Sequence, residues 1–146
     1  MIVYADSSVL ARAYLADEPY HDEARSLLED PDVVLVTGSW TDIEVSGALV
    51  RAARSHRGDL PELLAAWDSH TDPEGGLITL LTAPQEKVEA RALGIVRQHG
   101  LRAMDAWHVS IASLTVPELS DGEAYGFASR DKTQSEIASA YGFLTI

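Results

Sequence analysis

The segment 2-IVYADSSVLARAYL-15 decides the class of fold that we expect for this chain. A short apolar run at 2–5 reads as a buried strand. The polar triplet Asp6-Ser7-Ser8 follows it at once, and a helical pattern then continues through Leu15. A strand, a polar turn and a helix form the first unit of an α/β protein.

The remainder of the chain continues this alternation. We expect further strands at 33–36, 77–81, 125–129 and 142–146, and helices at about 20–29, 41–56, 84–99, 101–113 and 132–141. A turn-rich segment is expected around Pro117 and Asp121-Gly122. Strands that alternate with helices call for a parallel sheet that is covered on both faces. We therefore predict one α/β domain over residues 1–146, with a mainly parallel sheet of four to five strands.

A helical hairpin is expected at about 41–71, across Arg57-Gly58. In its second helix, apolar side chains recur at intervals of three and four residues, namely Leu60, Leu63, Leu64 and Trp67. This stripe could be part of the core, or it could line a groove for the amphipathic helix of a partner. The sequence leaves both interpretations open.

Composition limits the class of protein. The chain has no cysteine, which excludes disulfide frameworks and thiolate zinc sites. We find no signal segment and no apolar run long enough to cross a bilayer, so we expect a soluble cytoplasmic protein with no membrane association. The net charge of −12 argues against a generally basic nucleic-acid-binding surface, although 51-RAARSHR-57 and 91-RALGIVRQHGLR-102 are basic islands that contain no acid.

Four acidic residues lie where the expected elements bring chain segments to one edge of the sheet. They follow strands or stand in the first turns of helices, and they are Asp6, Glu44, Asp105 and Asp131. Asp6 and Asp131 could simply cap helices, and Glu44 could be an exposed helix residue that competes with Asp42 for the same role. Asp105 is harder to explain in that way, because it lies within the apolar helix 101-LRAMDAWHVSIAS-113.

Four carboxylates at one edge would raise one another's pKa values unless a cation lay among them. Oxygen ligands without cysteine or a pair of histidines favour one or two hard ions, Mg²⁺ or Mn²⁺, and disfavour zinc. Such ions polarise phosphoryl oxygens and activate water. The pattern therefore indicates a phosphodiesterase or a nuclease.

The four acidic motifs resemble those of the PIN-domain family, and within it those of the VapC toxins of bacterial toxin–antitoxin pairs. The matching segments are 2-IVYADSS-8, 39-SWTDIE-44, 104-MDAWHVSIA-112 and 127-FASRD-131, in the family's order and with the expected elements between them. The resemblance covers essentially the whole chain. It implies a PIN-like three-layer α/β/α sandwich, and the S-x4-E spacing favours Glu44 over Asp42.

The resemblance implies a Mg²⁺- or Mn²⁺-dependent endoribonuclease that leaves a 5′-phosphate. In that family the acidic residues that match Asp6, Glu44, Asp105 and Asp131 hold the metal, with Asp131 acting directly or through water. Ser8 and Ser129 would orient carboxylates. His108 could be a general base, but the family favours a packing or hydrogen-bonding role. A small VapB-like antitoxin and a homodimer are the partners that the resemblance implies.

Contacts to RNA, or to the carboxylate of a partner, are expected from Arg51, Arg130 and Lys132. Arg51 lies seven residues after Glu44 on the same helical stripe, with the small Ala48 between them. Two other functions are considered. A phosphatase with an aspartate nucleophile usually has a second aspartate two residues later, where this chain has Ser8. A PIN-like binding domain without turnover would not need the intact acidic set.

Overall fold

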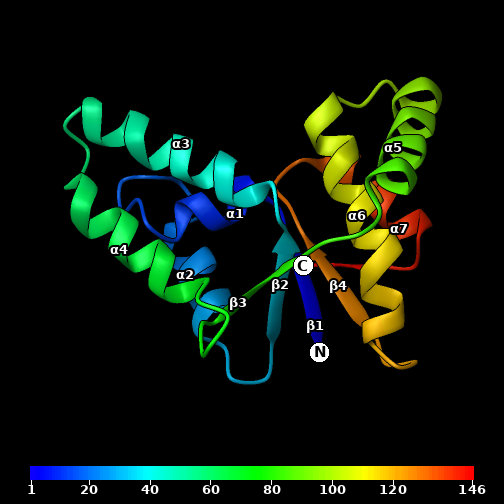
Figure 1. The fold of residues 1–146 in the computed structure, drawn as a ribbon, viewed down its shortest axis with the longest axis horizontal. Coiled ribbons are helices and arrows are strands. Elements are labelled where there is room, and N and C mark those ends of the chain that lie inside the picture. The colour runs from blue at the N-terminus through cyan, green and yellow to red at the C-terminus, as the bar shows by residue number, and fades with distance from the viewer.

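The computed structural model describes residues 1–146 as one five-stranded sheet flanked by seven helices (Figure 1). The strands are β1 (Ile2–Ala5), β2 (Val34–Gly38), β3 (Ile78–Leu81), β4 (Tyr125–Ala128) and β5 (Leu144–Thr145). Their order in the sheet is β3-β2-β1-β4-β5, and all neighbouring pairs are parallel. The predicted fold class is confirmed, and the sheet is parallel throughout.

The helices form two layers, one on each face of the sheet (Figure 1). One layer comprises α1 (Ser7–Arg12), α2 (His21–Glu29), α3 (Thr41–Arg54) and α4 (Leu60–His70). The other comprises α5 (Gln85–His99), α6 (Ala103–Leu119) and α7 (Lys132–Ala140). Each layer encloses its own apolar cluster of 15 buried residues.

The alternation of side chains along β1 separates these two clusters. Val3 and Ala5 belong to the cluster beneath α1–α4, whereas Tyr4 belongs to the cluster beneath α5–α7. All three are fully buried, because β1 is the central strand and is covered on both faces.

Two predicted boundaries are wrong. Helix α1 ends at Arg12, and short-range backbone bonds continue the chain as turns, from the amide of Ala13 to Leu10 and from that of Tyr14 to Ala11. The turn expected at Asp121-Gly122 is present, but Pro117 lies within the end of α6. A proline there removes only one hydrogen bond near the helix terminus, while the preceding Val116 is fully buried.

Helices α3 and α4 lie on the two sides of Arg57-Gly58 and contact each other. The side chain of Trp67 is fully buried, and Leu63 and Leu64 pack against the same cluster. These side chains contribute to the core, so Trp67 is not available to line a groove for a partner. The helices of the structure are all too short or too polar to cross a bilayer.

The order of the strands creates a natural site. The chain leaves β1 toward β2 on one side, and it later returns to place β4 on the other side. Ligands of open parallel sheets bind where the strand order reverses in this way, beyond the carboxyl ends of the strands. Here that position lies at the ends of β1 and β4, next to Asp6 and Ser129.

Candidate active site

Asp6 is fixed at the carboxyl end of β1 by several donors. Its Oδ1 accepts hydrogen bonds from the amide of Val9, at 3.0 Å, and from the hydroxyl of Ser8, at 2.8 Å. Its Oδ2 lies 3.3 Å from the hydroxyl of Ser129. The side chain caps α1 and is only 4% exposed. Capping therefore accounts for one oxygen and leaves the other directed toward Ser129.

Ser129 and Gln134 connect three of the acidic segments. The hydroxyl of Ser129 lies 2.5 Å from Oε1 of the fully buried Gln134, and it accepts a hydrogen bond from the amide of Asp131. Nε2 of Gln134 donates to the backbone carbonyl of Asp105 at 3.1 Å. This network ties the first turn of α6 to the end of β4. Nothing in the sequence indicated that Gln134 links α7 to Asp105.

Asp131 is the N-cap of α7, and its Oδ1 accepts a hydrogen bond from the amide of Gln134 at 2.9 Å. Asp131 also acts on the other acidic residues, because its charge adds to the effect of burial in raising the pKa of Asp105. The capping role and the acidic-site role are thus compatible.

Asp105 has the least supported carboxylate of the set. No donor contacts its side chain, and its pKa is raised, first by burial and then by the charges of Asp131 and Asp6. His108, when it is protonated, and Arg102 act in the opposite direction and lower the pKa of Asp105. The raised pKa shows that Asp6, Asp105 and Asp131 are near enough to interact.

Glu44 is held by two residues on other elements. Its Oε1 lies 2.7 Å from Nε2 of His108, and its Oε2 accepts a hydrogen bond from the hydroxyl of Ser7 at 3.1 Å. Asp42, the alternative candidate, points instead to α4, where its Oδ1 accepts from the indole of Trp67 at 2.7 Å. The structure therefore directs Glu44 toward the end of β1 and gives Asp42 a packing role.

His108 is a buried link in a hydrogen-bonded chain. It is 1% exposed, and its Nδ1 lies 2.7 Å from the hydroxyl of Tyr4, which accepts from the amide of Gly38 at 3.1 Å. Burial raises the pKa of Tyr4, so the phenol keeps its proton and can donate to Nδ1. We assign the remaining ring proton to Nε2, which donates to Glu44. Both ring nitrogens are occupied, which supports a positioning role rather than general-base catalysis.

The space beside Gly38, the last residue of β2, admits only glycine. A Cβ atom there would lie 2.4 Å from the ring of Trp107 and 3.0 Å from the hydroxyl of Tyr4. Trp107 also stacks on Trp40, with ring centroids 5.2 Å apart. Neither Tyr4 nor Gly38 was predicted as a site residue, because an aromatic residue in an apolar strand reads only as core.

The basic residues named from the sequence occupy different positions. Arg51 lines a cavity of about 450 Å³ together with Ser7, Ser8 and Glu44. Arg130 lies over the ring of Tyr20, 4.8 Å from its centroid, and the exposed Lys132 lies 3.8 Å from Glu136 on its own helix. Arg51 is thus beside the acidic residues, Arg130 stands next to Asp131 in the chain, and Lys132 is turned to solvent.

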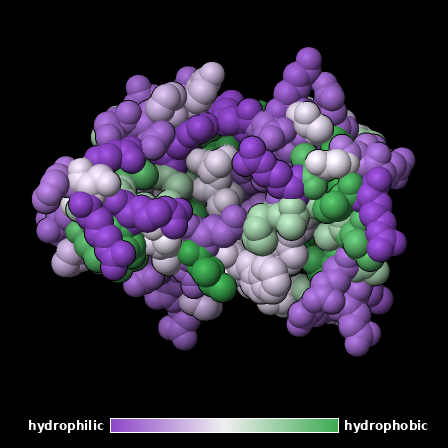
Figure 2. Space-filling view, turned by 90° about the horizontal axis from the view of Figure 1, so that it is seen from above, coloured by the Kyte–Doolittle hydropathy of each residue, from purple (hydrophilic) through white to green (hydrophobic).

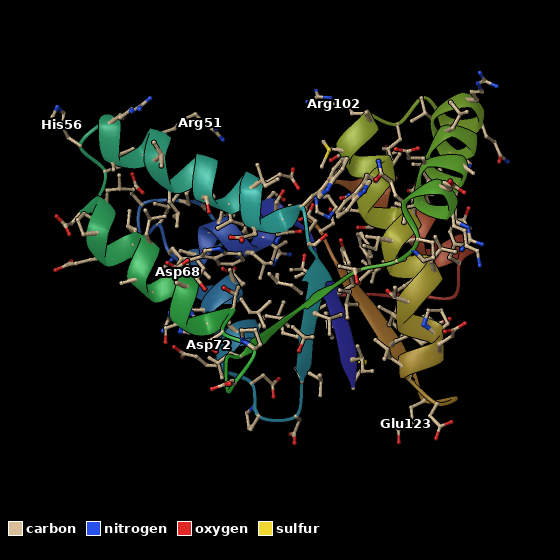
Figure 3. All side chains as sticks on the ribbon, in the orientation of Figure 1. Arg51, His56, Asp68, Asp72, Arg102 and Glu123 are labelled. Carbon is tan, nitrogen blue, oxygen red and sulfur yellow. The ribbon has the colours of Figure 1, made fainter.

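The surface agrees with this arrangement. Arg51 on α3 and Arg102 before α6 both project on the side of the molecule where the strands end (Figure 3). Viewed onto that side, the surface is mostly hydrophilic, with separate apolar patches on each half (Figure 2). An anionic ligand that approaches this side would therefore meet arginines around an acidic centre.

The acidic residues suit a hard divalent cation in their chemistry, since they offer carboxylate oxygens only. The unpartnered carboxylate of Asp105 is the strongest sign of such a fit. As they stand, however, no three acidic or histidine side chains of the chain are close enough together to hold an ion. Side-chain adjustment would therefore have to accompany binding.

Comparison with known proteins gives one clear result. The family model described as the PIN domain matches residues 3–140. A comparison with curated proteins found no match.

Proposed function

The chain belongs to the PIN-domain family, and from this premise we propose that it is a Mg²⁺- or Mn²⁺-dependent endoribonuclease, the toxin of a VapC-type toxin–antitoxin pair. PIN domains are typically nucleases, which supports a hydrolase that acts on nucleic acid. RNA as the substrate, the metal requirement and the toxin role are the proposed parts.

One observation carries the proposal. Asp6, Asp105 and Asp131 come from three distant segments, and the pKa of Asp105 is raised first by its burial and then by the charges of Asp131 and Asp6. A fold gains no stability from carboxylates that repel one another, so the arrangement favours a ligand that neutralises them. A divalent cation is the ligand whose chemistry matches oxygen donors alone.

Each residue has a defined part in this proposal. Asp6, Asp105 and Asp131 would hold the ion, and Glu44 would complete the set, directly or through water. When bound, the ion would polarise the phosphoryl oxygen and lower the pKa of a water molecule. Ser8 and Ser129 orient Asp6, while Tyr4 and His108 fix the rotamer of Glu44.

The test is cleavage of a 5′-labelled single-stranded RNA by the purified chain with Mg²⁺ or Mn²⁺, and with the ion removed by EDTA. Asp105→Asn should abolish cleavage and leave the fold intact. Asp42→Asn is the matched control, because its amide oxygen can still accept from Trp67, and it should cleave as the wild type does.

Two outcomes would overturn the proposal. The first is no RNA cleavage by wild-type protein when calorimetry shows that the ion is bound, which favours a binding domain without turnover. The second is equal cleavage by wild type and Asp105→Asn. Hydrolysis of a phosphate monoester, with trapping of a phosphoryl group on Asp6, would instead support the aspartate-nucleophile phosphatase.

The partners are proposed on the resemblance alone. We propose a small VapB-like antitoxin that inhibits the nuclease, and a homodimer as the active form. Light scattering at several protein concentrations tests the dimer, and a monomeric mass throughout the range would contradict it. We expect an adjoining gene to encode this antitoxin, and co-expression with its product should suppress cleavage at a stoichiometric ratio.

A further inference from the structure

A groove between α1 and α3 leads away from the acidic residues. Its two ends are a cavity of about 450 Å³ beside Ser7 and Glu44, and a second of about 350 Å³ farther along the helices. The two cavities share four lining residues, which are Ser8, Ala11, Ala48 and Arg51. They therefore form one continuous groove, and the small side chains of Ala11 and Ala48 leave it open.

The far cavity is basic although the chain as a whole is acidic. Three arginines and one carboxylate line it, namely Arg12, Arg51, Arg57 and Glu18. Arg57 is already paired, because its guanidinium binds Glu18 at 2.8 Å and Asp17 at 2.7 Å. Arg12 and Arg51 form no ion pair, so their charges are available to a ligand.

Arg12 carries the strongest sign of a missing partner. Its Nη1 is the one buried side-chain nitrogen or oxygen of the chain that has no hydrogen-bond partner. The guanidinium rests against the ring of Tyr20, 5.6 Å from the centroid, but this contact satisfies none of its donors. An unpaired buried donor destabilises the folded state, and an anion bound to the guanidinium would relieve this penalty.

The guanidinium of Arg51 packs beside Gly47 and lines the groove. A Cβ atom on Gly47 would lie 3.1 Å from Nη1 of Arg51, so the guanidinium lies close along the helix toward the turn that carries Glu44. Arg51 lines both cavities and stands between the acidic residues and Arg12. The two arginines without ion pairs therefore lie one after the other along the groove.

We propose that this groove binds the backbone of single-stranded RNA, with Arg12 and Arg51 contacting a phosphate that lies outside the cleaved bond. The inference rests on the proposed ribonuclease function and adds a phosphate subsite to it. The guanidinium fork binds phosphate oxygens in pairs, which suits two arginines without carboxylate partners. A polyanion also suits a groove that is basic at one end and reaches metal-binding carboxylates at the other.

The first test measures KM and kcat for a short single-stranded RNA over a series of salt concentrations. Arg12→Gln and Arg51→Gln should each raise KM about tenfold and change kcat little, because the contact lies away from the reacting atoms. The slope of log KM against log salt should fall by about 0.7 for each lost phosphate contact. Arg54→Gln is the matched control, an exposed arginine of α3 outside both cavities, and it should match the wild type.

The second test changes the RNA and leaves the protein intact. A neutral methylphosphonate is placed at one position after another, and one position outside the cleaved bond should raise KM about tenfold. In Arg12→Gln that same position should have no further effect, because the partner arginine is already absent. This cycle keeps the proposal testable if Arg12→Gln lowers stability.

The outcomes separate this proposal from the proposed function. If RNA is cleaved but KM and the salt slope of both variants equal those of the wild type, the phosphate subsite is wrong. If no RNA is cleaved, the proposed function fails, and fluorescence anisotropy with the same RNA then tests the groove. Weaker RNA binding by Arg12→Gln and Arg51→Gln supports the subsite, whereas equal RNA binding with weaker binding of polyglutamate overturns it in favour of an acidic protein partner.

Discussion

Asp6 and Asp105 stand at the same edge of the sheet but are held in opposite ways. Asp6 accepts hydrogen bonds from Ser8 and Val9 and faces Ser129, so its position is set by direct bonds. No donor contacts the carboxylate of Asp105. This residue is positioned by the packing of α6 against the sheet and by the bond from Gln134 to its backbone carbonyl. The fold thus provides one anchored carboxylate and one that lacks a counter-charge.

This difference separates an acidic residue that contributes to the stability of the fold from one that does not. Anchoring lets Asp6 cap α1 and serve the site together. Asp105 contributes no such local bond. Its raised pKa means that the metal-free fold disfavours the charged form of this side chain. Substitutions at the two positions should therefore separate loss of cleavage from loss of stability.

The largest effect is expected for Asp6→Asn. RNA cleavage at saturating Mg²⁺ should fall by more than about 100-fold, beyond the loss typical of removing a group that only orients a ligand. The amide oxygen can still accept from Val9, and asparagine caps helices as well as aspartate does, so the thermal midpoint should change little. Cleavage near the wild-type rate would show that Asp6 serves only as a cap.

Ser129→Ala tests whether anchoring itself matters. Asp6 Oδ2 and the amide of Asp131 both lose their contact with the hydroxyl, and cleavage should fall about 10- to 100-fold. Ser139→Ala is the control, because that hydroxyl donates to the backbone of Ser135 on its own helix. Equal rates for the two variants would mean that the orientation of Asp6 does not limit cleavage.

Asp131 lies between the two extremes, since it both caps a helix and acts electrostatically on Asp105. Asp131→Ala should lower the free energy of unfolding by about 1 kcal/mol through loss of the cap, and Asp131→Asn by much less. Urea denaturation measures both. A loss of cleavage in Asp131→Asn without a loss of stability would assign the charge of Asp131 to the site, and unchanged cleavage would assign it to the cap alone.

The smallest effect is a dependence of stability on pH at Asp105. Because its pKa is raised in the folded state, the folded protein retains this proton over a pH interval in which the unfolded chain has lost it. The contribution of Asp105 to stability therefore decreases as pH rises from its ordinary pKa through the raised one. The decrease is complete above the raised pKa.

Thermal midpoints in EDTA measure this effect. Asp105→Asn removes the titrating group, so its midpoint should exceed that of the wild type increasingly as pH rises from the ordinary carboxyl pKa through the raised one, and by a constant amount above it. Added Mg²⁺ should then raise the midpoint of the wild type but not that of the variant. An Asp105→Asn variant that is less stable at pH 7 without metal would show that the carboxylate has a structural partner.

The anchored and unanchored residues also differ in how well the sequence predicts them. The bonds within the segment Asp6–Val9 are local, so the strand, turn and helix signals of 2–15 were enough to place Asp6. The four acidic motifs likewise fall at the carboxyl end of β1 or β4 or in the first turns of α3 or α6. Local patterns therefore predicted most of the fold and the elements that carry the candidate site.

The missed features depend on contacts between distant segments. Tyr4 reads as an ordinary strand residue until the structure brings it to His108, and Gln134 gives no sequence sign of its bond to the carbonyl of Asp105. Arg12 was not predicted either, because the lack of a hydrogen-bond partner for its Nη1 depends on residues that only the folded chain brings around it. Pro117 was misread as a turn signal because burial of the adjacent Val116 was unknown.

The bond between Ser129 and Asp6 has a consequence for the order in which the protein is made. These residues are 123 positions apart, and β4 joins β1 only after most of the chain has left the ribosome. A nascent chain that lacks β4 and α7 has neither Asp131 nor the groups that tie Asp105 to Asp6. Completion of the acidic site therefore waits until β4 and α7 have been synthesised, and a shorter nascent chain lacks the assembled site.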